Sequence, residues 1–149
     1  MKIKLHGVRG SLPTPLSPPA LESKIELILE SYTKLFKATG ISTSKFLRNL
    51  PTHLKGGYGG NTACTEVSLN KTKILIDTGT GIRNSNNDYL TEGCGNGTGI
   101  VNILFTHFHW DHILGLPFFI PLYIKGNQIN FYSVQDDTEE VVRTLFKKP

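Results

Sequence analysis

The sequence predicts an α/β (α+β) protein in which a mixed, mostly antiparallel sheet is flanked by helices. Short apolar or alternating segments recur between glycine-rich loops, and amphipathic helical patterns stand near both ends of the chain. These two patterns indicate strands and helices packed around one core. The length of 149 residues and a hydrophobic content of 38% suit a single globular domain and argue against disorder.

Five segments have the pattern of strands. Residues 2–8 alternate Ile3 and Leu5 with lysines, which is typical of a half-buried strand. Residues 100–105 are continuously apolar and β-branched, which favours a fully buried strand. The remaining predicted strands are 63–70 and 73–77, joined by a polar turn, and 127–134.

The segment from 17 to 53 is predicted to be a helical insertion within a single domain spanning 1–149. Ser17 can cap a helix whose first turn holds two prolines, and apolar residues recur at helical spacing over 20–37. Gly40 is expected to end that helix, and a second short helix is expected over 42–50. We interpret the pair as a cover packed on the core, with a lid or a dimer surface as the alternative.

Other segments are predicted to be loops or a final helix. Residues 54–62 are too rich in glycine for regular structure, and residues 84–99 are polar and expected to be exposed. Two prolines favour a loop or short helix over 115–124. The last predicted helix, 138–148, follows Asp136 and Asp137, either of which can cap it.

Charge and cysteine content restrict the class of protein only loosely. The net charge of +4 fits ordinary surface lysines or, alternatively, a partner that carries phosphate. The two cysteines form no CxxC pair, and the N-terminal residues do not resemble a secretory leader. No apolar run approaches the length of about 20 residues that a membrane span needs. We therefore expect a cytoplasmic protein with reduced thiols and no membrane partner.

The strongest functional signal is the stretch THFHWDH at residues 106–112, which contains three of the five histidines. Alternate side chains of an extended chain point the same way, so His107 and His109 can converge on one point. Asp111 and His112 follow where the chain must turn, and they can face a second point nearby. Imidazole and carboxylate are ligands of zinc, iron and manganese. Phe108 and Trp110 are interpreted as packing residues.

These residues resemble the HxHxDH signature of the metallo-β-lactamase superfamily. Similar blocks occur at GVRGSLPTP (7–15), YGGNTACTEV (58–67), ILIDTGTGIR (74–83) and HILGLPFF (112–119). Together they resemble the phosphodiesterase-like branch of metal-dependent hydrolases related to ribonuclease Z and the cyclic-nucleotide phosphodiesterases. The resemblance implies an αββα sandwich, of which this chain matches the N-terminal half.

The resemblance also implies roles for individual residues. His107 and His109 match ligands of a first metal ion, and Asp111 and His112 match ligands of a second. The ions are expected to be zinc, with manganese or iron as alternatives. Asp77 matches an aspartate that holds a ligand histidine in place, although closing a strand explains it equally well. Asp111 and Asp77 are thus the candidate catalytic carboxylates.

The glycine-rich block at Gly59, Gly60 and Asn61 would lie near such a site, as a tight turn or as a substrate contact. The second half of the family fold supplies further histidine and aspartate ligands, yet no histidine follows His112. Asp136 and Asp137 are the only later aspartates, and capping explains them better. The chain is therefore expected to be a fragment, one subunit of a split enzyme, or an inactive degenerate product.

The sequence predicts a metal-dependent hydrolase, in which hydroxide shared by two metal ions attacks a phosphodiester. This chain would supply about half the site. The expected substrate is a phosphodiester small molecule or one derived from nucleic acid. A thioester or lactam hydrolase could use the same centre. The alternative from another class is a non-catalytic or split half-domain that needs a second chain, and we expect either a homo-oligomer or such a pairing.

Overall fold

The computed structural model describes residues 1–57, 59–70 and 72–147. The chain forms two compact units. One unit consists of residues 15–60, and the other combines residues 1–14 with the chain from Asn61 onward. Among the described residues, no helix combines the length and the apolar character that crossing a membrane requires.

Residues 15–60 form a helical unit with three helices: α1 (Pro18–Thr39), α2 (Thr43–Asn49) and α3 (Thr52–Lys55). The Ser17 side chain accepts a hydrogen bond from the amide of Ala20, and Gly40 ends α1 in a left-handed conformation, as predicted. α3 was not predicted. It is a single turn that ends at the glycine-rich segment.

The helices of this unit are held together along one side of α1. The ring of Tyr32 packs edge-on against Phe46 of α2 with the centroids 5.2 Å apart. Lys24 donates to the carbonyl of Gly56, after α3. No residue of α1 is buried. A short helical unit of this kind has little core of its own.

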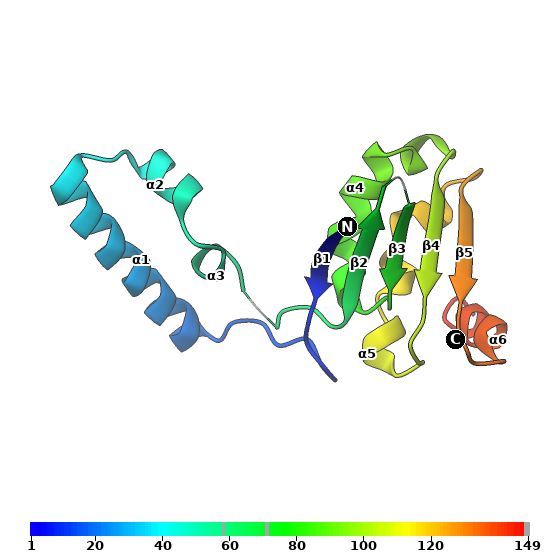
Figure 1. Cartoon of the computed structure of the whole chain (residues 1–149). Coiled ribbons are helices and arrows are strands. Elements are labelled where there is room, and N and C mark those ends of the chain that lie inside the picture. The colour runs from blue at the N-terminus through cyan, green and yellow to red at the C-terminus, as the bar shows by residue number, and fades with distance from the viewer. Residues whose placement is uncertain (58, 71, 148–149) are drawn as a thin grey trace. The chain divides into compact units, whose positions relative to one another are not determined.

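The second unit is built on one sheet with the strand order β1-β2-β3-β4-β5 (Figure 1). The strands are β1 (Lys2–Gly7), β2 (Cys64–Leu69), β3 (Thr72–Ile76), β4 (Ile100–Leu104) and β5 (Gln128–Tyr132). Four of them lie within the predicted ranges, and β3 begins one residue before the predicted 73–77. The mixed sheet is confirmed, but antiparallel pairing is confined to β1–β2–β3. β3–β4 and β4–β5 are parallel, because their connections contain helices instead of tight turns.

Helices follow each of the last three strands. β3 leads to the 3-10 helix η1 (Thr80–Ser85), α4 (Asn86–Thr91) and η2 (Cys94–Asn96). β4 leads to α5 (Trp110–Ile113), η3 (Leu116–Phe118) and η4 (Ile120–Tyr123), and β5 leads to α6 (Thr138–Thr144). Together they supply the side chains that cover one face of the sheet.

The core lies between that face and the helices. Leu75, Val101 and Ile103 from the strands are fully buried against Ile82, Tyr89, Cys94, Leu116 and Phe119 from the helices. The prediction that residues 84–99 are exposed is therefore wrong at Tyr89 and Cys94, which are 3% exposed. Tyr89 and Cys94 hold this polar stretch against the sheet, because burial of their side chains stabilises the short helices that contain them.

A small polar layer lies within the same unit. His6 and Glu66, on neighbouring strands, are 7% and 4% exposed, with 3.6 Å between His6 Nε2 and Glu66 Oε2. Burial lowers the pKa of His6, so this histidine is neutral at pH 7. The Tyr89 hydroxyl is also buried. It has no hydrogen-bond partner among the described residues.

Replacing Tyr89 with phenylalanine is expected to leave the free energy of unfolding unchanged or to raise it by up to about 1 kcal/mol, because the substitution removes an unsatisfied buried hydroxyl. The ring would keep its edge-on contact with Phe119, at 5.5 Å between centroids. Urea unfolding measures the effect. The matched control is Ser85→Ala, which removes a buried hydroxyl that donates to the carbonyl of Ile82 and should cost about 1 kcal/mol.

The other face of the sheet carries no charged side chain along its two central rows. One row contains Ile3, Val67, Ile74, Asn102 and Asn130, and the next contains Leu5, Thr65, Ile76, Leu104 and Tyr132. The charged strand residues, such as Lys4 and Glu66, point to the covered face instead. Leu5 and Tyr132 are 64% and 51% exposed. This is the reverse of the usual pattern, in which the solvated face of a sheet is the polar one.

Candidate metal centre

The parallel pairing of β3 and β4 brings two sequence blocks to one edge of the sheet. Asp77 directly follows β3, and the 106–112 stretch begins just after β4. Parallel strands end at the same edge, so side chains that follow them meet there. The amide of Asp77 donates to the carbonyl of Leu104 at 2.9 Å, which fixes the two segments against each other.

Asp77 connects Thr106 and His112 through hydrogen bonds at this edge. It is 5% exposed and has a left-handed backbone, with φ of 59°. Its carboxylate accepts hydrogen bonds from the amide and the hydroxyl of Thr106 and lies 2.8 Å from Nδ1 of His112. A short polar side chain tolerates this backbone conformation better than most. Asp77 thus both closes its strand and contacts a histidine of the motif.

The bond from Asp77 determines which nitrogen of His112 is available. A carboxylate accepts, so Nδ1 carries the proton and Nε2 keeps a free lone pair. This Nε2 lies 3.5 Å from Oδ2 of Asp111. The hydroxyl of Thr106 also lies 3.0 Å from Nδ1 of His107. Both rings are therefore held through Nδ1.

The three imidazole rings of the motif are in direct contact. The ring centroid of His107 is 4.6 Å from that of His109 and 4.0 Å from that of His112. His109 immediately precedes α5, and Asp111 and His112 lie within this single helical turn. The structure therefore brings together all four predicted metal ligands and Asp77.

Asp111 receives a contact from a distant part of the chain. The amide of Ser11 donates to its Oδ2 at 2.8 Å, and this bond lowers the pKa of the carboxyl. Ser11 itself has a left-handed backbone, with φ of 64°. The contact explains the proximity of the N-terminal GVRGS block to the histidines, which the sequence alone does not reveal.

The imidazoles and carboxylates at this edge are of the types that bind a divalent cation, but the distances between the rings fit such a site only in part. Zinc lies about 2.0–2.1 Å from an imidazole nitrogen, which places two ring centroids on one tetrahedral ion roughly 5 Å apart. The observed separations are shorter. Within residues 1–57, 59–70 and 72–147, no three His, Cys, Asp or Glu side chains are grouped so that they could hold a metal ion. His107 and His109, the pair predicted to share one ion, would have to separate by roughly half an ångström.

Two residues with roles here were missed in the sequence. Thr106 is the first residue of the motif, and its position between the strand and the first histidine is the signal that could have identified it. Ser11 offered no such signal, because its contribution is a backbone amide. Phe108 packs on Phe105 as expected, at 5.3 Å between centroids. The packing interpretation is wrong for Trp110, which is 70% exposed.

The glycine-rich block braces the loops near this edge. The carbonyl of Asn61 accepts from the amides of Val8 and Arg9 at 3.2 and 3.0 Å. Thr62 and Thr80 exchange hydrogen bonds between their amides and hydroxyls. These contacts do not distinguish a tight turn at Gly59, Gly60 and Asn61 from a substrate contact, so both interpretations stay predictions. Tyr58 of the YGGNT block lies outside the described residues.

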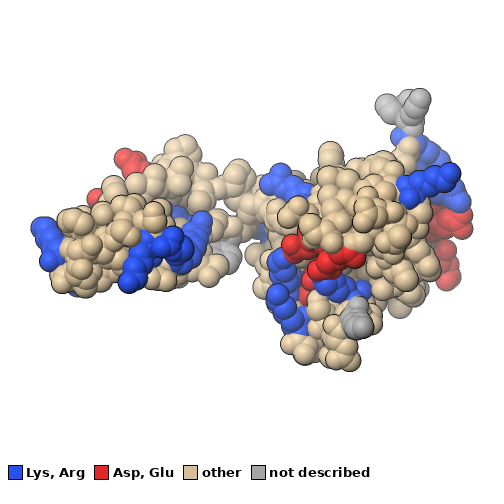
Figure 2. Space-filling view, turned by 90° about the horizontal axis from the view of Figure 1, so that it is seen from above, with Lys and Arg blue, Asp and Glu red and all other residues tan. Residues whose placement is uncertain are grey.

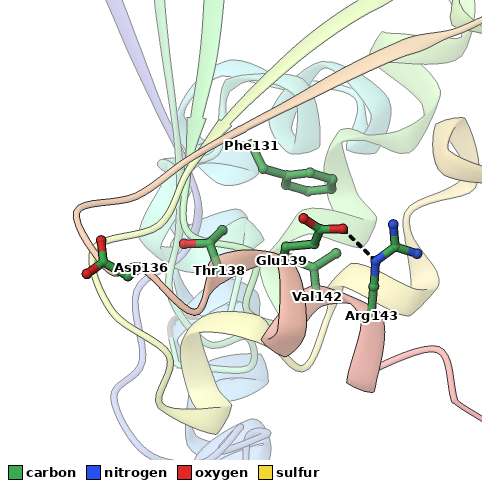
Figure 3. Close-up of a pocket in the computed structure, with 6 residues that line it drawn as sticks. All are labelled: Phe131, Asp136, Thr138, Glu139, Val142 and Arg143. Carbon is green, nitrogen blue, oxygen red and sulfur yellow. Dashed lines mark hydrogen bonds and ion pairs between the residues drawn. The ribbon is translucent and has the colours of Figure 1, made fainter.

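The late aspartates lie elsewhere. Asp137 is the first residue before α6, as predicted, but its side chain makes no capping hydrogen bond. Asp136 borders a cavity of about 600 Å³ (Figure 3), which is also lined by Phe131, Thr138, Glu139, Val142 and Arg143. The Arg143 guanidinium donates to Glu139 at 2.8 Å within this group. No residue of the histidine motif lines that cavity.

The charges show no continuous basic field on the face seen in Figure 2. Lys and Arg side chains are scattered there and interspersed with Asp and Glu. Several bases are neutralised locally, for example Lys73, which pairs with Glu92 at 2.6 Å. Taken one unit at a time, the described residues in this view form no extended basic surface for a polyanion.

Fold and site together define an α/β protein with histidines and carboxylates gathered at the ends of two parallel strands. Residues 72–148, just over half of the chain, match the model of the beta-lactamase superfamily domain, and the chain belongs to this family. Its five-stranded mixed sheet with flanking helices is consistent with part of a metallo-β-lactamase fold. The family consists of hydrolases that are typically metal-dependent. No curated protein and no solved structure gave a significant match.

Proposed function

We propose that this chain provides the metal-binding edge of a metal-dependent hydrolase that acts on an ester, with a phosphodiester as the preferred substrate class. The observation that supports this most directly is the hydrogen bond between Asp77 and Nδ1 of His112. It leaves Nε2 of His112 facing Asp111, which is the arrangement that a carboxylate-oriented histidine ligand needs.

In this proposal His107 and His109 would hold one divalent ion, and Asp111 and His112 would hold a second. When bound, such ions polarise an ester and make water a stronger nucleophile. Zinc suits the imidazoles, and manganese or iron would suit the carboxylates as well. Asp77 and Thr106 hold the rings through Nδ1, and the Ser11 amide keeps Asp111 ionised and in place.

Metal titration of the full chain tests this proposal. We expect zinc or manganese to bind, and the double substitution His107→Ala with His109→Ala to weaken the binding at least tenfold, because two imidazole ligands are lost. His53→Ala is the matched control, since His53 is exposed and lies in the helical unit. Equal affinity of the double variant and the control would overturn the assignment of the ligands.

A second candidate function is a split half-domain that acts only with a second chain. The uncharged open face of the sheet favours it, because a sheet face without charged side chains in its central rows is suited to packing against another layer. Hydrolysis of bis-p-nitrophenyl phosphate separates the two candidates. Metal binding with turnover by this chain alone would exclude the split form. Less than one bound ion per chain and no turnover would exclude the stand-alone enzyme.

A further inference from the structure

α1 carries an apolar stripe of which about half the side-chain surface is exposed. Leu21, Ile25, Leu29 and Phe36 are 47%, 48%, 58% and 51% exposed. Their spacing places them on one face of the helix. The side of α1 that contacts α2 and α3 borders this stripe and includes Lys24 and Tyr32.

The charges beside this stripe differ between the two halves of the helix. Glu22, Glu26 and Glu30 lie in the N-terminal part together with Lys24, whereas Lys34 and Lys37 lie in the C-terminal part. An open groove of about 710 Å³ lies beside the stripe, on its glutamate side, and is lined by Ile25, Leu29 and the three glutamates, among others. Glu22 and Lys37, near opposite ends of α1, therefore lie on the same side of the apolar stripe.

We propose that this face of α1 pairs with the same face of a second copy of the chain, with the two helices antiparallel. An antiparallel arrangement centred near Leu29 brings Glu22 of one copy beside Lys37 of the other, and the apolar stripes face each other. The contact is self-complementary, as a two-fold interface requires. The opposed helix dipoles also favour it.

The composition of α1 does not favour a membrane surface as the occupant. α1 has three acidic and three basic residues, namely Glu22, Glu26, Glu30, Lys24, Lys34 and Lys37. Helices that lie on anionic membranes carry an excess of lysine and arginine on the polar face. The balanced charge, with Glu22 near one end of α1 and Lys37 near the other, instead fits an antiparallel copy of the same helix.

Cysteine cross-linking of the full chain tests the orientation. With a rise of 1.5 Å per residue, the two copies of residue 29 would be neighbours, whereas the two copies of residue 21 would lie about 24 Å apart. We expect Leu29→Cys to cross-link with itself. Leu21→Cys should not cross-link with itself but should cross-link with a Phe36→Cys chain, because residue 36 lies on the same stripe and opposite residue 21 in this register. Cys64 and Cys94 are buried, and burial raises the pKa of Cys64 to about 12, so neither native thiol should react.

Sedimentation equilibrium tests the pairing itself. Ile25→Lys should raise the dissociation constant roughly a hundredfold, because each dimer loses two apolar contacts. Leu27→Lys is the matched control, since Leu27 is 54% exposed on the opposite side of the helix and should have no effect. Glu22→Lys should weaken the dimer, and adding Lys37→Glu should restore it.

A monomer at all concentrations would overturn the proposal, whether or not it binds anionic phosphatidylserine vesicles. Self-cross-linking of Leu21→Cys would overturn the antiparallel orientation. Circular dichroism of each variant verifies that α1 is still helical, so a loss of pairing can be attributed to the surface. Neither experiment uses metal or hydrolysis, so failure of this proposal leaves the proposed function untouched, and the reverse also holds.

Discussion

Replacing Asp77 with asparagine should lower the metal affinity of the chain by ten- to a hundredfold. The carboxylate receives two hydrogen bonds from Thr106 and lies 2.8 Å from Nδ1 of His112. Asparagine has only one acceptor oxygen and no charge, so it cannot satisfy Thr106 and also fix the imidazole tautomer. Isothermal titration with zinc measures the affinity. The free energy of unfolding should fall by about 1–3 kcal/mol, because charge-assisted bonds in a buried position are lost.

Asparagine is the informative substitution because the backbone at Asp77 is left-handed, with φ of 59°. Asparagine adopts that conformation almost as readily as aspartate, so the loss of affinity can be assigned to the carboxylate. Asp77→Ala would add backbone strain and should be less stable than Asp77→Asn. If Asp77→Asn bound zinc as tightly as the parent chain, the role of Asp77 in orienting His112 would be wrong.

Replacing Gly79 with alanine should destabilise the sheet unit by about 3 kcal/mol or more. A methyl group at Gly79 would lie 2.2 Å from the carbonyl oxygen of Asp111, 2.5 Å from the hydroxyl of Thr62 and 2.7 Å from the carbonyl oxygen of Ala63. Two of these contacts are with backbone, which cannot rotate away. The backbone angles of Gly79, φ of −59° and ψ of −179°, are open to any residue, so the effect is purely steric.

The same substitution should also weaken metal binding, because the clash pushes on the backbone of Asp111 itself. Urea unfolding gives the stability, and zinc titration of the fraction that stays folded gives the affinity. Gly10→Ala is the matched control. A methyl group there meets no atom within 4 Å, and the stability should change by less than about 0.5 kcal/mol. Equal stabilities of the two variants would contradict the close approach of these loops.

The strands and the long helix could be predicted because each has a local pattern. Alternation in the first strand, an apolar run before the histidines, and Ser17 and Gly40 at the ends of α1 all depend on neighbouring residues only. The parallel pairing of β3 with β4 could not be predicted in this way. It depends on the helices between the strands, and these are fixed by the isolated buried side chains of Tyr89 and Cys94 in a polar stretch.

The candidate site likewise has residues that the sequence predicts and supporting contacts that it does not predict. The motif predicts which side chains gather, because His107 to His112 are close in sequence. Their support is not local. Thr106 could be inferred from its position, but the amide of Ser11 lies 100 residues from the carboxylate that it contacts. A backbone donor has no residue-type signature, so only the fold reveals it.

Because β1 lies at the edge of the sheet, the two sides of the candidate site differ in the free energy needed to separate them from the rest of the unit. β1 pairs only with β2, and half of its six residues are exposed. Such an edge strand can detach in a local fluctuation that costs less free energy than global unfolding. Detachment would carry Ser11 away and release Asp111, whereas the Asp77–His112 contact depends on β3 and β4 and would persist. The site can therefore loosen at its carboxylate side while the imidazoles remain ordered.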